Sequence, residues 1–464
     1  MSTKPYTRSL ILASVAAAPV IFGPAGADAL EPIESLGKNI FFDEKLSIPA
    51  NKQACASCHD PARGWILPNA TINATTVVAP GAKPHAVGNI KPHANAYASF
   101  SPPFRRGSFG PFTAPWEGGN FWDGRAEGCG ATPGADCPTA EPRGAVSATI
   151  RSSGLPSSLQ ARYAKYLGPI ADQALNPFPN DVEQNIREKN VCQQVKTAKY
   201  KDLYRQAYGG DIDCSPNPKA NPACRTSFKR LAVALAAWQA SSDVNSFSSR
   251  RDKKLADDPD HAFPLVGFTD QENLGHDLFY GIDSELNRGG KDARCTACHN
   301  GVPRGEPADP KGEAPKQLYT DNRFHHIGVP FNRQIQGVAK GAKTGLRAHV
   351  TDVQAGSFRT PTLRNVAKGL SASFKKAYTH NGWFKSLESL VHFYNTRDVL
   401  RSCESLGITQ ATEKEALQNN CWPAPEFPNP AVFVVGNLGL TASEEAAIVA
   451  YMKTLSDERT PKKP

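Results

Sequence analysis

The sequence predicts a mainly α-helical protein built from two domains. Its 464 residues exceed the size of one ordinary hydrophobic core and suit two. The pattern Cys-x-x-Cys-His occurs twice, at residues 55–59 and 295–299, and an apolar helix-like segment leads into each copy. Strand-like alternation is sparse, and 38 Pro and 37 Gly residues indicate long ordered loops between the helices. We place a linker in the polar segment 243–264, so that domains 30–254 and 255–464 hold one copy each.

Three further segments carry helix signals. The apolar run Phe228–Trp238 predicts a helix that closes the first domain. Thr269 with Glu272, and Thr441 with Glu444, match the capping box, in which a threonine and a glutamate three residues later each bond the other's backbone N–H group. We therefore expect one helix to begin after each threonine.

Residues 1–29 have the composition of a secretory signal peptide. Lys4 and Arg8 precede an apolar run at 10–22, and Ala27-Asp28-Ala29 gives a small-residue cleavage site. The apolar run is shorter than the roughly 20 residues that a membrane-spanning helix needs, and no later stretch is long and apolar enough. We expect an exported, periplasmic protein without a membrane span. The formal net charge is +9. Because the sequence has no run of Lys and Arg interleaved with aromatic residues, we do not expect nucleic acid as a partner.

The repeated pattern predicts two covalent haem sites. Two thiols separated by two residues can add to the two vinyl groups of one haem, and the adjoining His then reaches the iron. A thioredoxin-like or zinc site would not explain a His beside both Cys pairs. His59 and His299 are the predicted axial ligands. The predicted thioether residues are Cys55, Cys58, Cys295 and Cys298. The expected fold is therefore two cytochrome-c-like helical domains with one c-type haem each.

Seven other cysteines remain, an odd number. Three short-range pairs suggest disulfides and leave Cys192 over, although spacing does not fix connectivity. The pairs are Cys129 with Cys137, Cys214 with Cys224, and Cys403 with Cys421.

Three motifs surround the haem patterns in a fixed order. They are Asn-Phe-Trp-Asp-Gly-Arg-Ala at 120–126, Phe-Arg-Thr-Pro-Thr-Leu-Arg-Asn at 358–365 and Tyr-Thr-His-Asn-Gly at 378–382. In combination they resemble the bacterial di-haem cytochrome c peroxidase and MauG family, over most of residues 34–457. The resemblance implies that Trp122 lies between the haems and passes charge from one to the other. A buried structural Trp is the alternative interpretation.

The resemblance also implies a peroxide site at the first haem. Residues 173–177, Gln-Ala-Leu-Asn-Pro, followed by Glu183, are similar to the family's Gln-Ala-x-x-Pro and distal Glu. Glu183 would then act as general acid–base with Gln173 assisting. An insertion near 128–168, which smaller peroxidases lack, would cover or shape the entrance. We expect the first iron to be open, with His85 and His93 as polar loop residues.

Tyr394 is the predicted second ligand of the second haem. It lies fourteen residues after His380, where classical members of the family supply Met, and Met452 is the one Met left after signal removal. Helical spacing from Leu387 and Val391 places Tyr394 on a buried face. Tyr in this place resembles MauG, and an anionic phenolate stabilises oxidised iron. A core Tyr with a satisfied hydroxyl is the alternative.

Two weaker metal interpretations concern other residues. Asn89 resembles the family's side-chain ligand to a calcium ion, with backbone carbonyl partners near Lys375 and Ala377. His325 and His326 are expected to pack or to line a haem edge, because no carboxylate or Cys accompanies them at ligand spacing.

The expected function is reduction of hydrogen peroxide at the open N-terminal haem. Electrons would pass through the second haem from a small exported donor, a cytochrome c or a cupredoxin. The resemblance to MauG leaves open a second chemistry, in which a high-valent di-haem state oxidises Trp or Tyr side chains of a protein substrate. A non-catalytic di-haem electron carrier is the alternative of another class, and it would need both haems closed.

Overall fold

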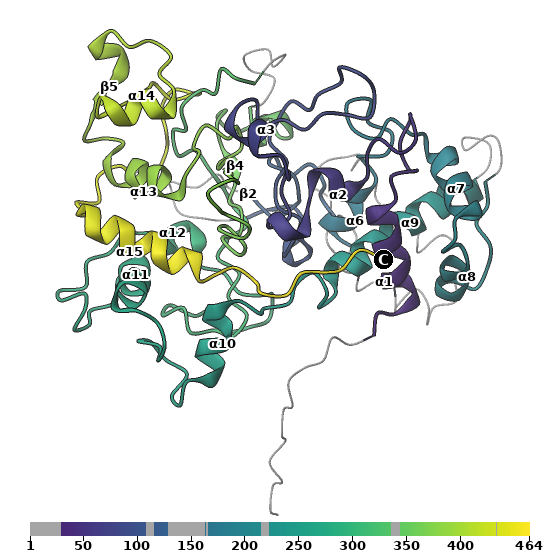
Figure 1. Cartoon of the computed structure of the whole chain (residues 1–464), viewed down its shortest axis with the longest axis horizontal. Coiled ribbons are helices and arrows are strands. Elements are labelled where there is room, and N and C mark those ends of the chain that lie inside the picture. Colours follow the sequence, from purple (N-terminus) through teal and green to yellow (C-terminus); the bar gives the residue numbers. More distant parts are fainter. Residues whose placement is uncertain are drawn as a thin grey trace, which may run out of the picture.

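The computed structural model describes residues 29–107, 116–128, 163, 166–214, 222–335, 344–432 and 434–464, and their regular structure is mainly helical (Figure 1). The helices in the N-terminal half are α1 (Pro32–Phe42), α2 (Cys55–Cys58), α3 (Ala70–Ala74), α6 (Pro169–Ala174), α7 (Glu188–Thr197), α8 (Asp202–Tyr208) and α9 (Pro222–Ala240). Those in the C-terminal half are α10 (Arg250–Asp257), α11 (Asp270–Tyr280), α12 (Thr296–His299), α13 (Leu387–Thr396), α14 (Glu413–Gln418) and α15 (Ala442–Lys453).

The strands of the described residues are two residues long, and each pairs with one other strand. Antiparallel pairs join β1 (Arg105–Arg106) to β2 (Trp116–Glu117) and β3 (Phe324–His325) to β4 (Phe358–Arg359). A parallel pair joins β5 (Arg401–Ser402) to β6 (Cys421–Trp422). Long loops connect these elements, as the Pro and Gly content predicts.

Each half has its own hydrophobic core, crossed by a similar pair of helices (Figure 1). A side chain at Gly37 of α1 would place its Cβ 1.9 Å from the carbonyl oxygen of Ala234 in α9. A side chain at Gly275 of α11 would likewise place its Cβ 1.9 Å from the carbonyl oxygen of Ala447 in α15. Only glycine allows this approach. Gly37 and Gly275 therefore mark the points where the two pairs of helices cross.

The predicted caps are confirmed. At the start of α11, the hydroxyl of Thr269 accepts a hydrogen bond from the backbone N–H of Glu272. The carboxylate of Glu272 in turn accepts one from the backbone N–H of Thr269. Thr441 and Glu444 make the same pair at the start of α15. The predicted helix Phe228–Trp238 lies inside α9.

The segment 243–264, predicted to be a linker, contains helix α10. Its Asp252 carboxylate accepts two hydrogen bonds from the guanidinium of Arg364, at 2.7 and 2.9 Å, and the Arg side chain is fully buried. The sequence alone shows a polar segment and not the residue that binds it, so the segment was predicted to be a linker. The ion pair with Arg364 makes the segment part of the packed structure.

The chain end ties the two halves together. After α15 the chain runs back across the molecule toward the N-terminal half (Figure 1). Asp457 in this segment accepts hydrogen bonds from the hydroxyl of Tyr97 and from the amide of Asn365, each at 2.8 Å.

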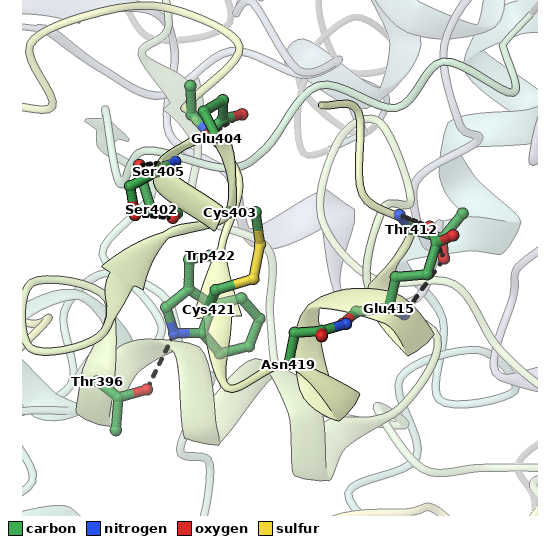
Figure 2. The surroundings of a disulfide bond; sticks show 11 residues. Thr396, Ser402, Cys403, Glu404, Ser405, Thr412, Glu415, Asn419, Cys421 and Trp422 are labelled. Atoms are coloured by element: carbon green, nitrogen blue, oxygen red, sulfur yellow. Dashed lines mark hydrogen bonds between the residues drawn. A yellow bond between two sulfur atoms is a disulfide. The ribbon is translucent and has the colours of Figure 1, made fainter. Parts of the chain in front are cut away.

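One of the predicted disulfides is confirmed, and one is wrong. Cys403 and Cys421 are bonded (Figure 2). Cys214 and Cys224 are free thiols, as is Cys192, whose sulfur lies 3.8 Å from the carbonyl oxygen of Cys224. Closeness in sequence does not bring two Cβ atoms into bonding geometry. The pair Cys129 and Cys137 lies outside the described residues.

Residues 1–28 of the predicted signal peptide and most of the predicted insertion at 128–168 lie outside the described residues. Within the described part, no helix has both the length and the hydropathy that crossing a bilayer requires.

Candidate haem and peroxide site

The first Cys-x-x-Cys-His motif lines a cavity in the N-terminal half. Cys55 and Cys58, on the single turn α2, are free thiols, and both face this cavity with His59. The Nδ1 of His59 donates to the carbonyl of Trp65 at 3.3 Å, which leaves Nε2 available to a metal. Burial lowers the pKa of His59 to about 4, so the imidazole is neutral, as an iron ligand must be.

The second motif repeats this arrangement. Cys295 and Cys298 are free thiols that line a second cavity together with His299. The Nδ1 of His299 donates to the carbonyl of Tyr319 at 2.9 Å, again leaving Nε2 available. Each cavity thus holds two free thiols and one oriented neutral imidazole, which is the set that a covalent haem requires.

Gln173 and Glu183 line the first cavity, as predicted. Gln173 lies on α6 and is buried, whereas Glu183 is half-buried and its carboxylate accepts a hydrogen bond from the amide of Asn180 at 2.8 Å. Burial, and after it the charge of Glu183, raises the pKa of the Cys58 thiol to about 12. The carboxylate therefore lies within electrostatic reach of the haem-attachment residues.

Trp122 belongs to the wall of both cavities. Its ring centroid is 6.3 Å from that of His93 and 6.4 Å from that of His380. Its indole N–H donates to the carbonyl of Lys91 at 2.8 Å. The indole ring of Trp122 therefore lies between the two cavities and separates the groups that each would hold.

Tyr394 faces the second cavity from α13, together with Leu387 and Val391 of the same helix. Burial, followed by the thiols of Cys298 and Cys295, raises the pKa of Tyr394. Among the residues that the structure describes, no hydrogen-bond partner of its hydroxyl is found.

Met452 of α15 lines the same cavity. The cavity therefore offers iron either a phenol or a thioether in addition to His299.

Comparison with known proteins identifies the family. The family model for di-haem cytochrome c peroxidase matches residues 31–260. The chain belongs to this family. It is accordingly a di-haem oxidoreductase of the cytochrome c peroxidase and MauG type, and the family implies c-type haem in its cavities.

Relatives of both types are found. The methylamine utilization protein MauG of Paracoccus denitrificans is 25% identical over 466 residues, which cover 97% of this chain and 96% of MauG. The cytochrome-c peroxidase IdrP2 of Denitromonas iodatirespirans is 25% identical over 211 residues, 41% of each chain.

Solved structures share the fold. The diheme peroxidase BthA of Burkholderia thailandensis superposes with a TM-score of 0.59 at 22% identity, covering 94% of this chain and 91% of BthA. A MauG-like protein associated with microbial copper homeostasis gives 0.56 at 20% identity, covering 96% of this chain and 97% of its own.

His93 is the residue of this di-haem oxidoreductase whose place in the structure the sequence interpretation missed. His85 is exposed, but His93 is buried and lines both cavities. Its Nδ1 donates to the carbonyl of Ala94 at 3.0 Å, and its Nε2 accepts from the amide of Gln173 at 3.2 Å. Both ring nitrogens therefore have hydrogen-bond partners within the protein. No local motif marks this role, because α6 supplies the partner from 80 positions along the chain.

His325 has a carboxylate partner that the sequence interpretation denied. Its Nε2 lies 2.7 Å from a carboxylate oxygen of Asp321, four residues earlier, and Cys298 lies within 4.8 Å of both groups. Because Cys298 is a predicted thioether residue, this cluster forms part of the second haem cavity. His326 donates to the carbonyl of Phe427 at 3.1 Å, and both His residues line the cavity, as the haem-edge interpretation expects.

Proposed function

We propose that this chain reduces hydrogen peroxide at a haem held in the first cavity by Cys55, Cys58 and His59. The observation that carries the proposal is the presence of Glu183 and Gln173 in the wall of that same cavity. Reduction of one peroxide takes two protons and two electrons and gives two water molecules. The bound haem supplies the electron-transfer chemistry.

The protein's own part is proton transfer. The Glu183 carboxylate would accept a proton from one peroxide oxygen and return it to the departing oxygen, which is general acid–base work. Asn180 holds the carboxylate in place by its hydrogen bond at 2.8 Å. The Gln173 amide, fixed against His93, would orient the peroxide.

Electrons would arrive through a haem in the second cavity. His299 and Tyr394 would hold that haem, and Trp122, shared by the two walls, would pass the charge. The expected donor is a small periplasmic cytochrome c or cupredoxin.

A second candidate function is oxidation of Trp or Tyr side chains in a partner protein. Two observations favour it: the Tyr394 hydroxyl stands in the second cavity without a partner among the described residues, and MauG aligns with nearly the whole chain. An anionic oxygen ligand stabilises the oxidised states of iron and suits this chemistry.

One experiment addresses both candidates. The diferric protein is mixed with one equivalent of peroxide and followed by optical and EPR spectroscopy. Simultaneous loss of both ferric signals supports oxidation of a partner, whereas reaction only after partial reduction supports a conventional peroxidase. If neither the diferric nor the half-reduced protein reacts with peroxide, both candidate functions are contradicted and a non-catalytic electron carrier is favoured.

The acid–base role has a matched control. Glu183→Gln should slow the peroxide reaction at least about 100-fold. Asp181→Asn, two residues earlier and exposed, should leave the rate unchanged. Equal rates in parent and Glu183→Gln would refute the role.

A further inference from the structure

Three lysine side chains converge at the boundary between the two halves. Lys91 and Lys376 are buried, at 8% and 3% exposure, and Lys385 is half-buried. Lys91 comes from the N-terminal half and the other two from the C-terminal half. The backbone N–H of Lys91 donates to the carbonyl of His380, so the halves touch at this point.

The ammonium groups of these lysines bond to backbone carbonyl oxygens. Lys376 donates to the carbonyls of Asn365 and Lys368, at 3.0 and 3.2 Å. Lys385 reaches across the boundary to the carbonyl of Asn73, at 3.0 Å. Lys91 donates to Pro92, at 3.3 Å. Carbonyl oxygens collected from separate segments are also what a calcium ion takes as ligands.

Among the described residues, no Asp or Glu carboxylate pairs with the ammonium of Lys91 or Lys376, whose hydrogen-bond acceptors are backbone carbonyls. A buried charge needs a partner of opposite sign. Lys376 lines the second cavity and Lys91 lines both, so the propionate carboxylates of the haems are the available partners.

The calcium ligands that the family suggests do not fit here. Asn89 is exposed, and the carbonyl of Lys375 accepts a hydrogen bond from the amide of Asn73 at 3.2 Å, which takes up one of its two lone pairs. Lys376 lies between the two predicted carbonyl donors, and Lys91 follows Asn89 by two residues. The positive charges of these two side chains would repel a divalent cation bound to their neighbours in sequence.

We propose that Lys91 and Lys376 take the place of a divalent cation at the boundary between the halves and serve as counter-charges of the haem propionates. The protein then needs no calcium. This inference rests on haem in the cavities, which the family implies, and not on the proposed peroxide chemistry. Its failure and that of the proposed function are therefore distinguishable.

Calcium dependence is measured first. The holoprotein as purified is analysed for calcium per chain, then dialysed against EGTA or against excess calcium. We expect well under one calcium per chain, with identical ferric spectra and unfolding temperatures in both samples. One tightly held calcium per chain, with spectra that change when EGTA removes it, would overturn the proposal.

Reduction potentials measure the counter-charge role. Lys376→Met removes a positive charge beside a haem, so at least one haem should have a lower reduction potential, and Lys376→Arg should retain most of the parent value. Lys414→Met removes an exposed lysine from the same half and should change neither potential. Lys91→Met provides a second test if the first variant does not fold. Parent-like potentials in a folded Lys376→Met or Lys91→Met protein would overturn the assignment.

Discussion

The indole N–H of Trp122 donates to the backbone carbonyl of Lys91 at 2.8 Å, while the ammonium of the same lysine lies 5.5 Å from the centroid of the indole ring. A carbonyl is a poor proton acceptor, so an oxidised indole would keep its proton and its positive charge. The nearby ammonium opposes that charge. Lys91 therefore both orients the indole and raises the cost of oxidising it.

Removal of this ammonium should make Trp122 easier to oxidise. At an effective dielectric constant of about 20, two unit charges 5.5 Å apart repel by about 3 kcal/mol, less any share that a propionate neutralises. Lys91→Met keeps the backbone carbonyl and should give a larger organic-radical EPR signal after peroxide, whereas Lys91→Arg should resemble the parent. An unchanged signal in Lys91→Met would show that the charge does not act on the indole.

Trp122→Phe should slow charge equilibration between the haems at least about tenfold, because phenylalanine is much harder to oxidise than indole and fills less of the shared wall. Rapid mixing of half-reduced protein, followed optically, measures this rate. Trp116→Phe is the control, since Trp116 is also buried but belongs to a separate hydrophobic cluster. Equal rates in parent and Trp122→Phe would assign Trp122 a packing role.

Most of the haem chemistry could be predicted because it is local in sequence. Each Cys-x-x-Cys-His motif places its reactive atoms within five residues, and helical spacing alone puts Tyr394 on the face that lines the second cavity. The two threonine caps are local for the same reason.

The features that sequence reasoning missed depend on distant partners. Asp252 is held in the packed structure by an ion pair with Arg364, 112 positions away. His93 is held in the cavity wall by a hydrogen bond with Gln173, 80 positions away. His325 was misjudged for another reason. Its carboxylate partner is only four residues away, but the cysteine comes from helix α12, 27 positions earlier in the chain.

Tyr394→Phe should alter the ferric EPR signal of the second haem, because a benzyl group cannot bind iron. Tyr378→Phe is the matched control: Tyr378 lines the same cavity, but its hydroxyl already donates to the carbonyl of Val366, at 3.4 Å. If Tyr394→Phe leaves the signal intact and Met452→Leu changes it, the thioether of Met452 is the ligand.

His93→Ala should leave the ferric spectrum of the first haem unchanged, because both ring nitrogens are engaged by Ala94 and Gln173. The variant should nevertheless react with peroxide several-fold more slowly, since a lost hydrogen bond of about 1 kcal/mol frees the Gln173 amide. Stopped-flow mixing gives the rate, and His85→Ala at an exposed position is the control. A shift of the ferric signal in His93→Ala would instead identify His93 as an iron ligand.

The disulfide between Cys403 and Cys421 should stabilise the helix that carries Tyr394. Trp422, next to Cys421, donates to the hydroxyl of Thr396, the last residue of α13 (Figure 2). A crosslink over 18 residues contributes about 3 kcal/mol, chiefly by restricting the unfolded chain. Replacing both cysteines with serine should lower the free energy of unfolding by about that amount in denaturant titrations.

The same double variant separates global from local effects. If the crosslink also holds the end of α13, the ferric signal of the second haem should broaden under native conditions while that of the first stays sharp. Dithiothreitol provides the control, since it should destabilise the parent and leave the double serine variant unaffected. A variant as stable as the parent, with both signals sharp, would show that the loop packing around Trp422 is sufficient without the disulfide.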